Sequence, residues 1–217
     1  MVYGLSVSMA MLSMGGEAHL NPAVTIAMTL TLRLRPWRAI LYVMAQLSGS
    51  LAAAALVLGL TGDISPTVNQ LAPGVQVYQA VLLETLVTFQ LVLVVLATTH
   101  LMSSHPSLSV LASLFVGLAV SLGHLQAITL RRGMRGDDKH SLCTCLSVYL
   151  SVCPGQVYRV WDESGQVFWA GPCAGACLAV LLNDLLLRPR WGCLGDWWAE
   201  LKEFFPSEQL DTHSYTP

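Results

Sequence analysis

The chain has 217 residues, of which 54% are hydrophobic and only 11% are charged, and its formal net charge is −2. Soluble domains contain roughly 25% charged residues, so this composition argues against an ordinary soluble domain and favours a membrane protein. The sequence shows no basic patch suited to nucleic acid, no glycine-rich phosphate loop, and no nucleophile grouped with a base and an orienting residue. We therefore expect neither enzymatic activity nor a cofactor.

The distribution of charged residues predicts the membrane spans. A helix needs roughly 20 apolar residues to cross the hydrocarbon core of a bilayer. Five stretches lack Asp, Glu, Lys and Arg, apart from Glu84 in the third: 1–16, 39–60, 77–99, 106–130 and 166–183. These stretches predict an all-α membrane protein with five spans, the first of which is either a span or the remnant of one.

The basic residues predict the orientation of the spans, because short loops rich in Lys and Arg favour the cytoplasm. Two clusters precede the second stretch and follow the last one, and both are expected inside: Arg33, Arg35 and Arg38, and Arg188 and Arg190. The cluster that begins at Arg131 breaks this pattern, because it follows the fourth stretch on the predicted extracellular side. The break indicates that residues 129–166 are an atypical segment.

A short apolar segment at 18–28 lies between the first stretch and Arg33. It is too short to cross a bilayer, which needs roughly 20 residues. Asn21 is a good N-cap, and Pro22 has no backbone N–H to satisfy at the first helical position. A helix that starts at membrane depth is tolerated only where its end lines a water-filled cavity or is buried in protein. This pattern therefore predicts a half-helix that lines a water pore.

The segment from Ala18 to Thr25 resembles the first signature motif of the aquaporin family. Four further segments resemble the family's third to sixth spans: 38–49, 84–93, 111–128 and 167–176. The resemblance covers about three quarters of the chain. It implies an aquaporin-like helical bundle in the plasma membrane that conducts water passively, with subunits assembled as a homotetramer or in mixed tetramers with related channels.

The resemblance also implies roles for single residues in the pore. Asn21 would donate its side-chain amide to passing water, and Pro22 and Ala23 would shape the turn at the pore centre. The backbone carbonyl groups of Ala18 and His19 would form part of the path of hydrogen-bond acceptors for water.

Three further residues carry implied roles, two of them with alternatives. His124 and Tyr3 would belong to a narrow outer filter, although a lone histidine on an apolar helix is usually a packing residue. Glu84 would accept hydrogen bonds from the pore loop. A proton-relay carboxylate is the alternative for Glu84, since ionisable residues within membranes are functional candidates by default.

The sequence departs from the family pattern, which is an inverted repeat of three spans and a half-helix. We expect an incomplete repeat, because no first span precedes Met1 and no second Asn-Pro-Ala motif follows Ile128. Residues 129–166 contain no Asn, so they are expected to form an atypical loop in place of the second pore loop. Arg131 directly follows the fifth span of the family pattern and is not expected to replace the filter arginine. Glu17 stands where a small residue is usual.

We divide the chain into a transmembrane channel domain at 1–190 and a cytoplasmic tail at 191–217 with a short amphipathic helix. The predicted function is passive water conduction. The alternative is a non-conducting truncated or splice-variant relative that associates with full-length channels. No metal is expected, because the cysteines at 143 and 145 near His140 give only a weak zinc-binding pattern.

Overall fold

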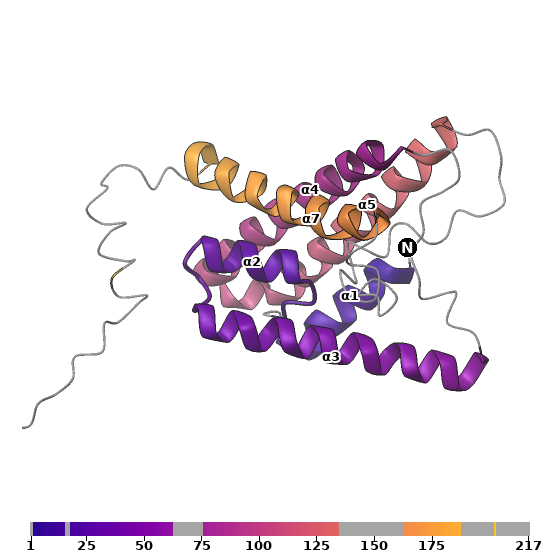
Figure 1. Cartoon of the computed structure of the whole chain (residues 1–217). Helices are drawn as coiled ribbons and strands as arrows, with labels where there is room; N and C mark the ends of the chain where they lie inside the picture. The colour runs from indigo at the N-terminus through magenta and orange to yellow at the C-terminus, as the bar shows by residue number, and fades with distance from the viewer. Residues whose placement is uncertain (1, 16–17, 63–75, 135–162, 188–201, 203–217) are drawn as a thin grey trace, which may run out of the picture.

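The computed structural model describes residues 2–15, 18–62, 76–134, 163–187 and 202. Every regular element within these residues is helical (Figure 1), which confirms the predicted all-α membrane fold. The elements are α1 (Val2–Ser13), α2 (Pro22–Leu30), α3 (Pro36–Thr61), α4 (Val77–Ser104), the 3₁₀ turn η2 (Pro106–Leu108), α5 (Ser109–Met134), α7 (Glu163–Leu182) and the π-helical turn η3 (Asn183–Leu187).

Among the described residues, four helices are long and apolar enough to cross a membrane: α3, α4, α5 and α7 with its π-helical end. The first predicted span is shorter. Helix α1 has 12 residues, which at 1.5 Å per residue reach about 18 Å, whereas the hydrocarbon core is about 30 Å thick. The prediction left open whether the first stretch is a full span or the remnant of one, and the 12 described residues of α1 are too few for a full span.

Part of the atypical segment at 129–166 is helical rather than a loop, because α5 continues to Met134. The helix therefore extends into the basic cluster without a break at the end of the apolar stretch. The rest of this segment falls mainly in 135–162, which lies outside the described residues. The predicted tail helix within 191–217 lies outside them as well, except for a single position.

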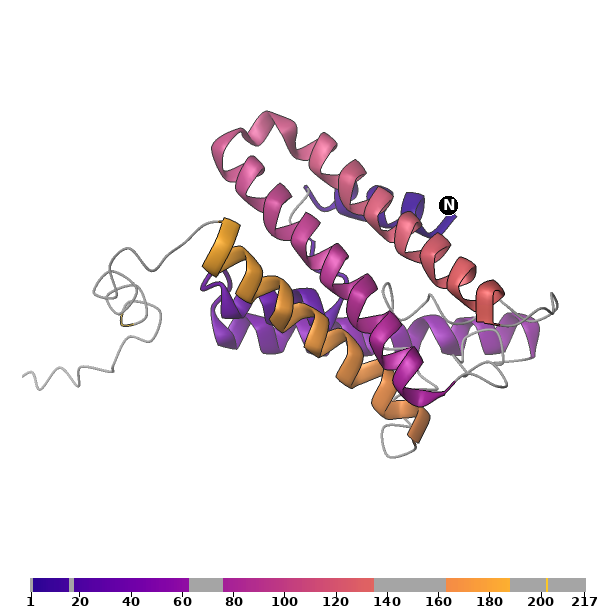
Figure 2. The same ribbon diagram turned by 90° about the horizontal axis from the view of Figure 1, so that it is seen from above.

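Helices α4 and α5 form an antiparallel hairpin joined at η2, and α7 runs beside α4 (Figure 2). Small residues let α7 and α4 approach closely, as is common between membrane helices. A methyl group added at Gly171 would lie 2.8 Å from Glu84 Cβ, and one added at Gly175 would lie 2.9 Å from the backbone nitrogen of Phe89. Helix α2 contacts α3, α4 and α7, so the short helix is held by long ones.

Helix α1 crosses α5 through two matching sequence segments. Residues 4–8 read Gly-Leu-Ser-Val-Ser and residues 117–121 read Gly-Leu-Ala-Val-Ser. The contacts are reciprocal: a methyl group at Gly4 would overlap the Gly117 carbonyl oxygen, and one at Gly117 would overlap the Gly4 carbonyl oxygen. The Ser8 hydroxyl donates to the carbonyl oxygen of Ser113 at 3.1 Å. The two segments are thus related by a local two-fold arrangement, as an inverted repeat would produce.

This crossing predicts that Gly117→Ala destabilises the protein, because the new methyl group has no space against the backbone of α1. Overpacking of this kind costs about 1–3 kcal/mol. Thermal unfolding in detergent measures the effect as a lower midpoint. Gly49→Ala in α3 is the matched control, since no atom beyond its own stretch of helix lies within 4 Å of the added methyl group. An unfolding midpoint of Gly117→Ala equal to that of Gly49→Ala would contradict the close crossing.

Candidate functional site

The half-helix α2 begins where the sequence predicted. Asn21 is its N-cap, with φ −143° and ψ 128°, and Pro22 occupies the first turn. The side-chain Oδ1 of Asn21 accepts a hydrogen bond from the Ala23 backbone N–H at 2.7 Å, and the Thr25 N–H donates to the Asn21 carbonyl oxygen at 3.0 Å. With nine residues, α2 reaches about 14 Å and does not cross a bilayer.

A tight reversal ends α2 and leads into α3. Leu32 adopts a left-handed conformation with φ 58°, which is uncommon outside glycine. The backbone N–H groups of Arg33 and Leu34 both donate to the Met28 carbonyl oxygen, at 2.9 and 3.1 Å. The Arg33 side chain also donates to the carbonyl oxygen of Leu96 on α4 at 3.3 Å. Backbone and side-chain bonds thus fix the C-terminal end of the half-helix.

A glutamine of α3 holds the start of the half-helix. Gln46 Nε2 donates to the His19 carbonyl oxygen at 2.6 Å and to Thr25 Oγ1 at 3.0 Å. The Thr25 hydroxyl, which is fully buried, donates to the Asn21 carbonyl oxygen at 3.1 Å. Gln46 was not among the predicted site residues. The signal that could have found it is an amide in the middle of an otherwise uncharged span, where burial requires a hydrogen-bonding partner.

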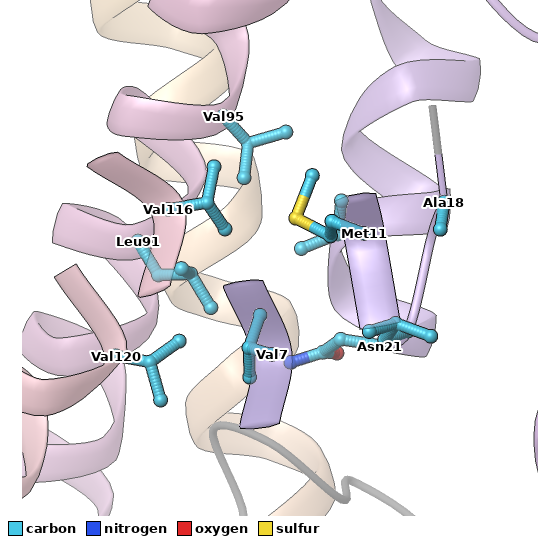
Figure 3. A pocket seen from close by; sticks show the side chains of 10 residues that line it. Val7, Met11, Ala18, Asn21, Leu91, Val95, Val116 and Val120 are labelled. Atoms are coloured by element: carbon cyan, nitrogen blue, oxygen red, sulfur yellow. The ribbon is translucent and has the colours of Figure 1, made fainter. Parts of the chain in front are cut away.

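A narrow cavity of about 40 Å³ lies beside the start of the half-helix (Figure 3). A site needs roughly 10–15 Å³ of such volume to hold one water molecule, so the cavity has room for about three or four. Its lining comes from α1, the loop before α2, α2, α4 and α5: Val7, Met11, Ala18, Leu20, Asn21, Val24, Leu91, Val95, Val116 and Val120.

Asn21 is the polar side chain among these lining residues. Figure 3 shows its amide nitrogen turned toward Val7, while its Oδ1 accepts the Ala23 N–H bond described above. The side chain therefore uses its acceptor to cap α2 and presents a donor on the cavity side. The N-terminal end of α2 adds a partial positive charge at the same place. This arrangement suits a small neutral ligand with an oxygen acceptor.

The predicted pore residues separate into two groups. Ala18 and Asn21 line the cavity, whereas His19 does not. The carbonyl oxygen of His19 accepts the Gln46 bond, and its ring packs on Tyr42 with centroids 4.9 Å apart. His19 lies in the loop before α2, outside the four long helices.

The two predicted filter residues lie at the same end of the α1–α5 crossing. His124 is buried and follows Val120 by four residues on α5, so it continues the cavity-facing stripe one turn, or about 6 Å, further along the helix. The backbone of Tyr3 precedes Val7 by four residues on α1. The side chain of Tyr3 lies outside the described residues, as does the whole of Glu17.

Glu84, the predicted support of the pore loop, is buried on α4 beneath Gly171 of α7. It does not line the cavity. The described part of the chain contains no cluster of three or more His, Cys, Asp or Glu side chains able to hold a metal ion. The predicted weak zinc pattern at 140–145 lies outside the described residues.

Comparison with known proteins agrees with this geometry. Residues 1–183 match the family described as Major intrinsic protein. Aquaporin-1 of Bos taurus is 38% identical over 201 residues, which cover 90% of this chain and 69% of that protein. Aquaporin-1 of Sus scrofa is 36% identical over the same shares, and Aquaporin-1 of Homo sapiens is 35% identical over 90% of this chain and 70% of that protein. The chain therefore belongs to the major intrinsic protein family, the aquaporin family of membrane channels, and it is an integral membrane protein rather than an enzyme.

Proposed function

We propose that this chain forms a passive pathway for water that runs past Asn21. The observation that carries the proposal is the narrow cavity at the capped start of α2, where Asn21 supplies the polar side chain. Water moves through such a pathway down an osmotic gradient, so no covalent chemistry and no cofactor are involved. Membership of the aquaporin family supports the same permeant.

The physical chemistry of the cavity explains why water would pass and ions would not. Valine and leucine side chains offer water no hydrogen bonds, so a molecule moves along them without being held. The Asn21 amide offers a donor at one point of the path. The positive end of the α2 dipole disfavours cations there, as such half-helix ends do in other pores.

The remaining roles extend this proposal to the outer end of the pathway and to its surroundings. Tyr3 and His124 would form a filter one helical turn beyond Val7 and Val120. Ala18 would offer a backbone acceptor to water, whereas the His19 carbonyl oxygen, which was expected to do the same, accepts a hydrogen bond from the Gln46 amide, and His19 does not line the cavity. Glu84 would hold the pore loop. We further propose the plasma membrane as the location, and a homotetramer or a mixed tetramer with related channels as the assembly.

A substitution of Asn21 distinguishes its role as a hydrogen-bond donor to water from its role as the cap of α2. Asn21→Asp keeps an oxygen for the Ala23 N–H but removes the amide donor and adds a negative charge. Loss of one hydrogen bond to water costs about 1 kcal/mol, which corresponds to roughly fivefold slower passage. Stopped-flow light scattering of proteoliposomes after an osmotic step measures the change. Permeability equal to that of the unchanged protein, with equal amounts inserted, would contradict the assigned role.

A further prediction concerns Gln46. Gln46→Leu keeps the approximate size but leaves the part-buried carbonyl oxygen of His19 without this donor, which costs up to about 1–3 kcal/mol. We expect a lower unfolding midpoint together with lower water permeability, because the pore loop loses its anchor. The control is Ser48→Ala on the same helix, whose exposed hydroxyl bonds only within α3, to Ala45. Equal behaviour of the two variants would show that Gln46 does not hold the loop.

A further inference from the structure

Met11 differs from the other residues that line the cavity. It lies four residues after Val7 on the same face of α1 and is 7% exposed. The other lining side chains are those of Ala, Val, Leu and Asn. Methionine is the longest among them, and it is unbranched. Figure 3 shows its side chain extending from α1 toward Val95 and Val116, across the space that separates α1 from α4 and α5.

The cavity is so small that the Met11 side chain determines how much of its space remains for water. With about 40 Å³ available, the cavity has room for only about three or four water molecules, so the Cγ, Sδ and Cε atoms of a single methionine fill a comparable space. The thioether is only a weak hydrogen-bond acceptor, so it excludes water without replacing the bonds that water loses. Rotation about its three side-chain bonds lets methionine adapt to irregular gaps, which valine in the opposite wall cannot do.

The α1–α5 crossing holds Met11 in this place. Gly4 and Ser8 face α5, whereas Val7 and Met11 face the cavity, so each pair occupies its own side of α1. The close backbone contact at Gly4 and Gly117 fixes the distance between α1 and the valines of α5. The width of the gap that remains therefore depends on the side chain at position 11 more than on movement of the helices.

We propose that the Met11 side chain sets the narrowest point of the water pathway and thereby the rate at which water crosses. This inference rests on the proposed function, because it assigns a rate-setting residue to the same pathway. Met11 acts as a positioned obstacle whose rotamers open and narrow the passage, and it takes no part in capping the half-helix.

Three substitutions at this position test the proposal in proteoliposomes. Met11→Ala removes the obstacle, and we expect a several-fold rise in osmotic water permeability per inserted protein. Met11→Leu keeps a similar volume with fewer rotatable bonds, and we expect its permeability to stay well below that of Met11→Ala. Met11→Phe fills the gap with a rigid ring and should lower permeability toward that of protein-free vesicles. Unfolding midpoints in detergent confirm that each variant is folded. Equal permeability of the three folded variants would overturn the proposal.

A second measurement keeps the inference testable if the unchanged protein conducts no water. Val120→Cys places a thiol in the cavity wall opposite α1, and the small neutral reagent methyl methanethiosulfonate probes its accessibility. Mass spectrometry of the peptide containing position 120 separates this thiol from the native cysteines. Faster modification with Met11→Ala than with Met11→Leu would support Met11 as the obstacle even though the proposed function had failed. Equal rates would overturn the inference on its own.

Discussion

A helix that begins at membrane depth must satisfy its first backbone N–H groups without help from lipid, and the site depends on this constraint. In water such groups bond to solvent, but in a bilayer each unsatisfied group costs several kcal/mol. Here the Asn21 side chain accepts the Ala23 N–H, and Pro22 has no N–H to satisfy. Asn21 therefore ends the loop, caps the helix and turns its amide donor toward the cavity.

The constraint extends to α3 through Gln46. Its amide nitrogen joins the His19 carbonyl oxygen to the Thr25 hydroxyl, which in turn donates to the Asn21 carbonyl oxygen. The first turn of the half-helix and the loop before it are thus connected to a long helix by one side chain. A pore loop held in this way keeps its donor in a fixed place, which a water pathway needs if passage is to be fast and selective.

The side of the cavity formed by α1 and α5 depends on a different interaction, the close contact between these two helices. The matching segments at 4–8 and 117–121 let α1 and α5 meet backbone to backbone, and they place Val7 and Val120 beside the half-helix. This is the local two-fold arrangement that an inverted repeat would produce, and it is seen in the reciprocal backbone contacts of Gly4 and Gly117. The sequence contains a single Asn-Pro-Ala motif. The cavity beside this motif is lined by residues of α1, α2, α4, α5 and the loop before α2, so its walls do not require a second copy of the motif.

The parts of the structure that carry distinctive chemistry were predictable from the sequence. The Asn21-Pro22 pair marked the start of the half-helix because capping and the missing N–H leave a local signature, and uncharged stretches marked the long helices. The ends of α1 and α5 were harder to predict, because the boundaries of an uncharged stretch mark the ends of a helix only approximately. The residues that form the cavity wall could not be predicted from the sequence at all. An apolar residue such as Val95 or Met11 has the same helical spacing whether it faces lipid, another helix or water, and only the packing shows which.

The account leads to one central claim, that this chain provides a pathway for water beside Asn21. The most direct test is the rate at which liposomes containing the purified protein shrink after an osmotic step, compared with protein-free liposomes of the same lipid and size. The account predicts faster shrinkage that increases in proportion to the amount of protein inserted. Shrinkage no faster than in protein-free liposomes, with folded protein in the membrane, would contradict it and would favour a non-conducting relative of full-length channels.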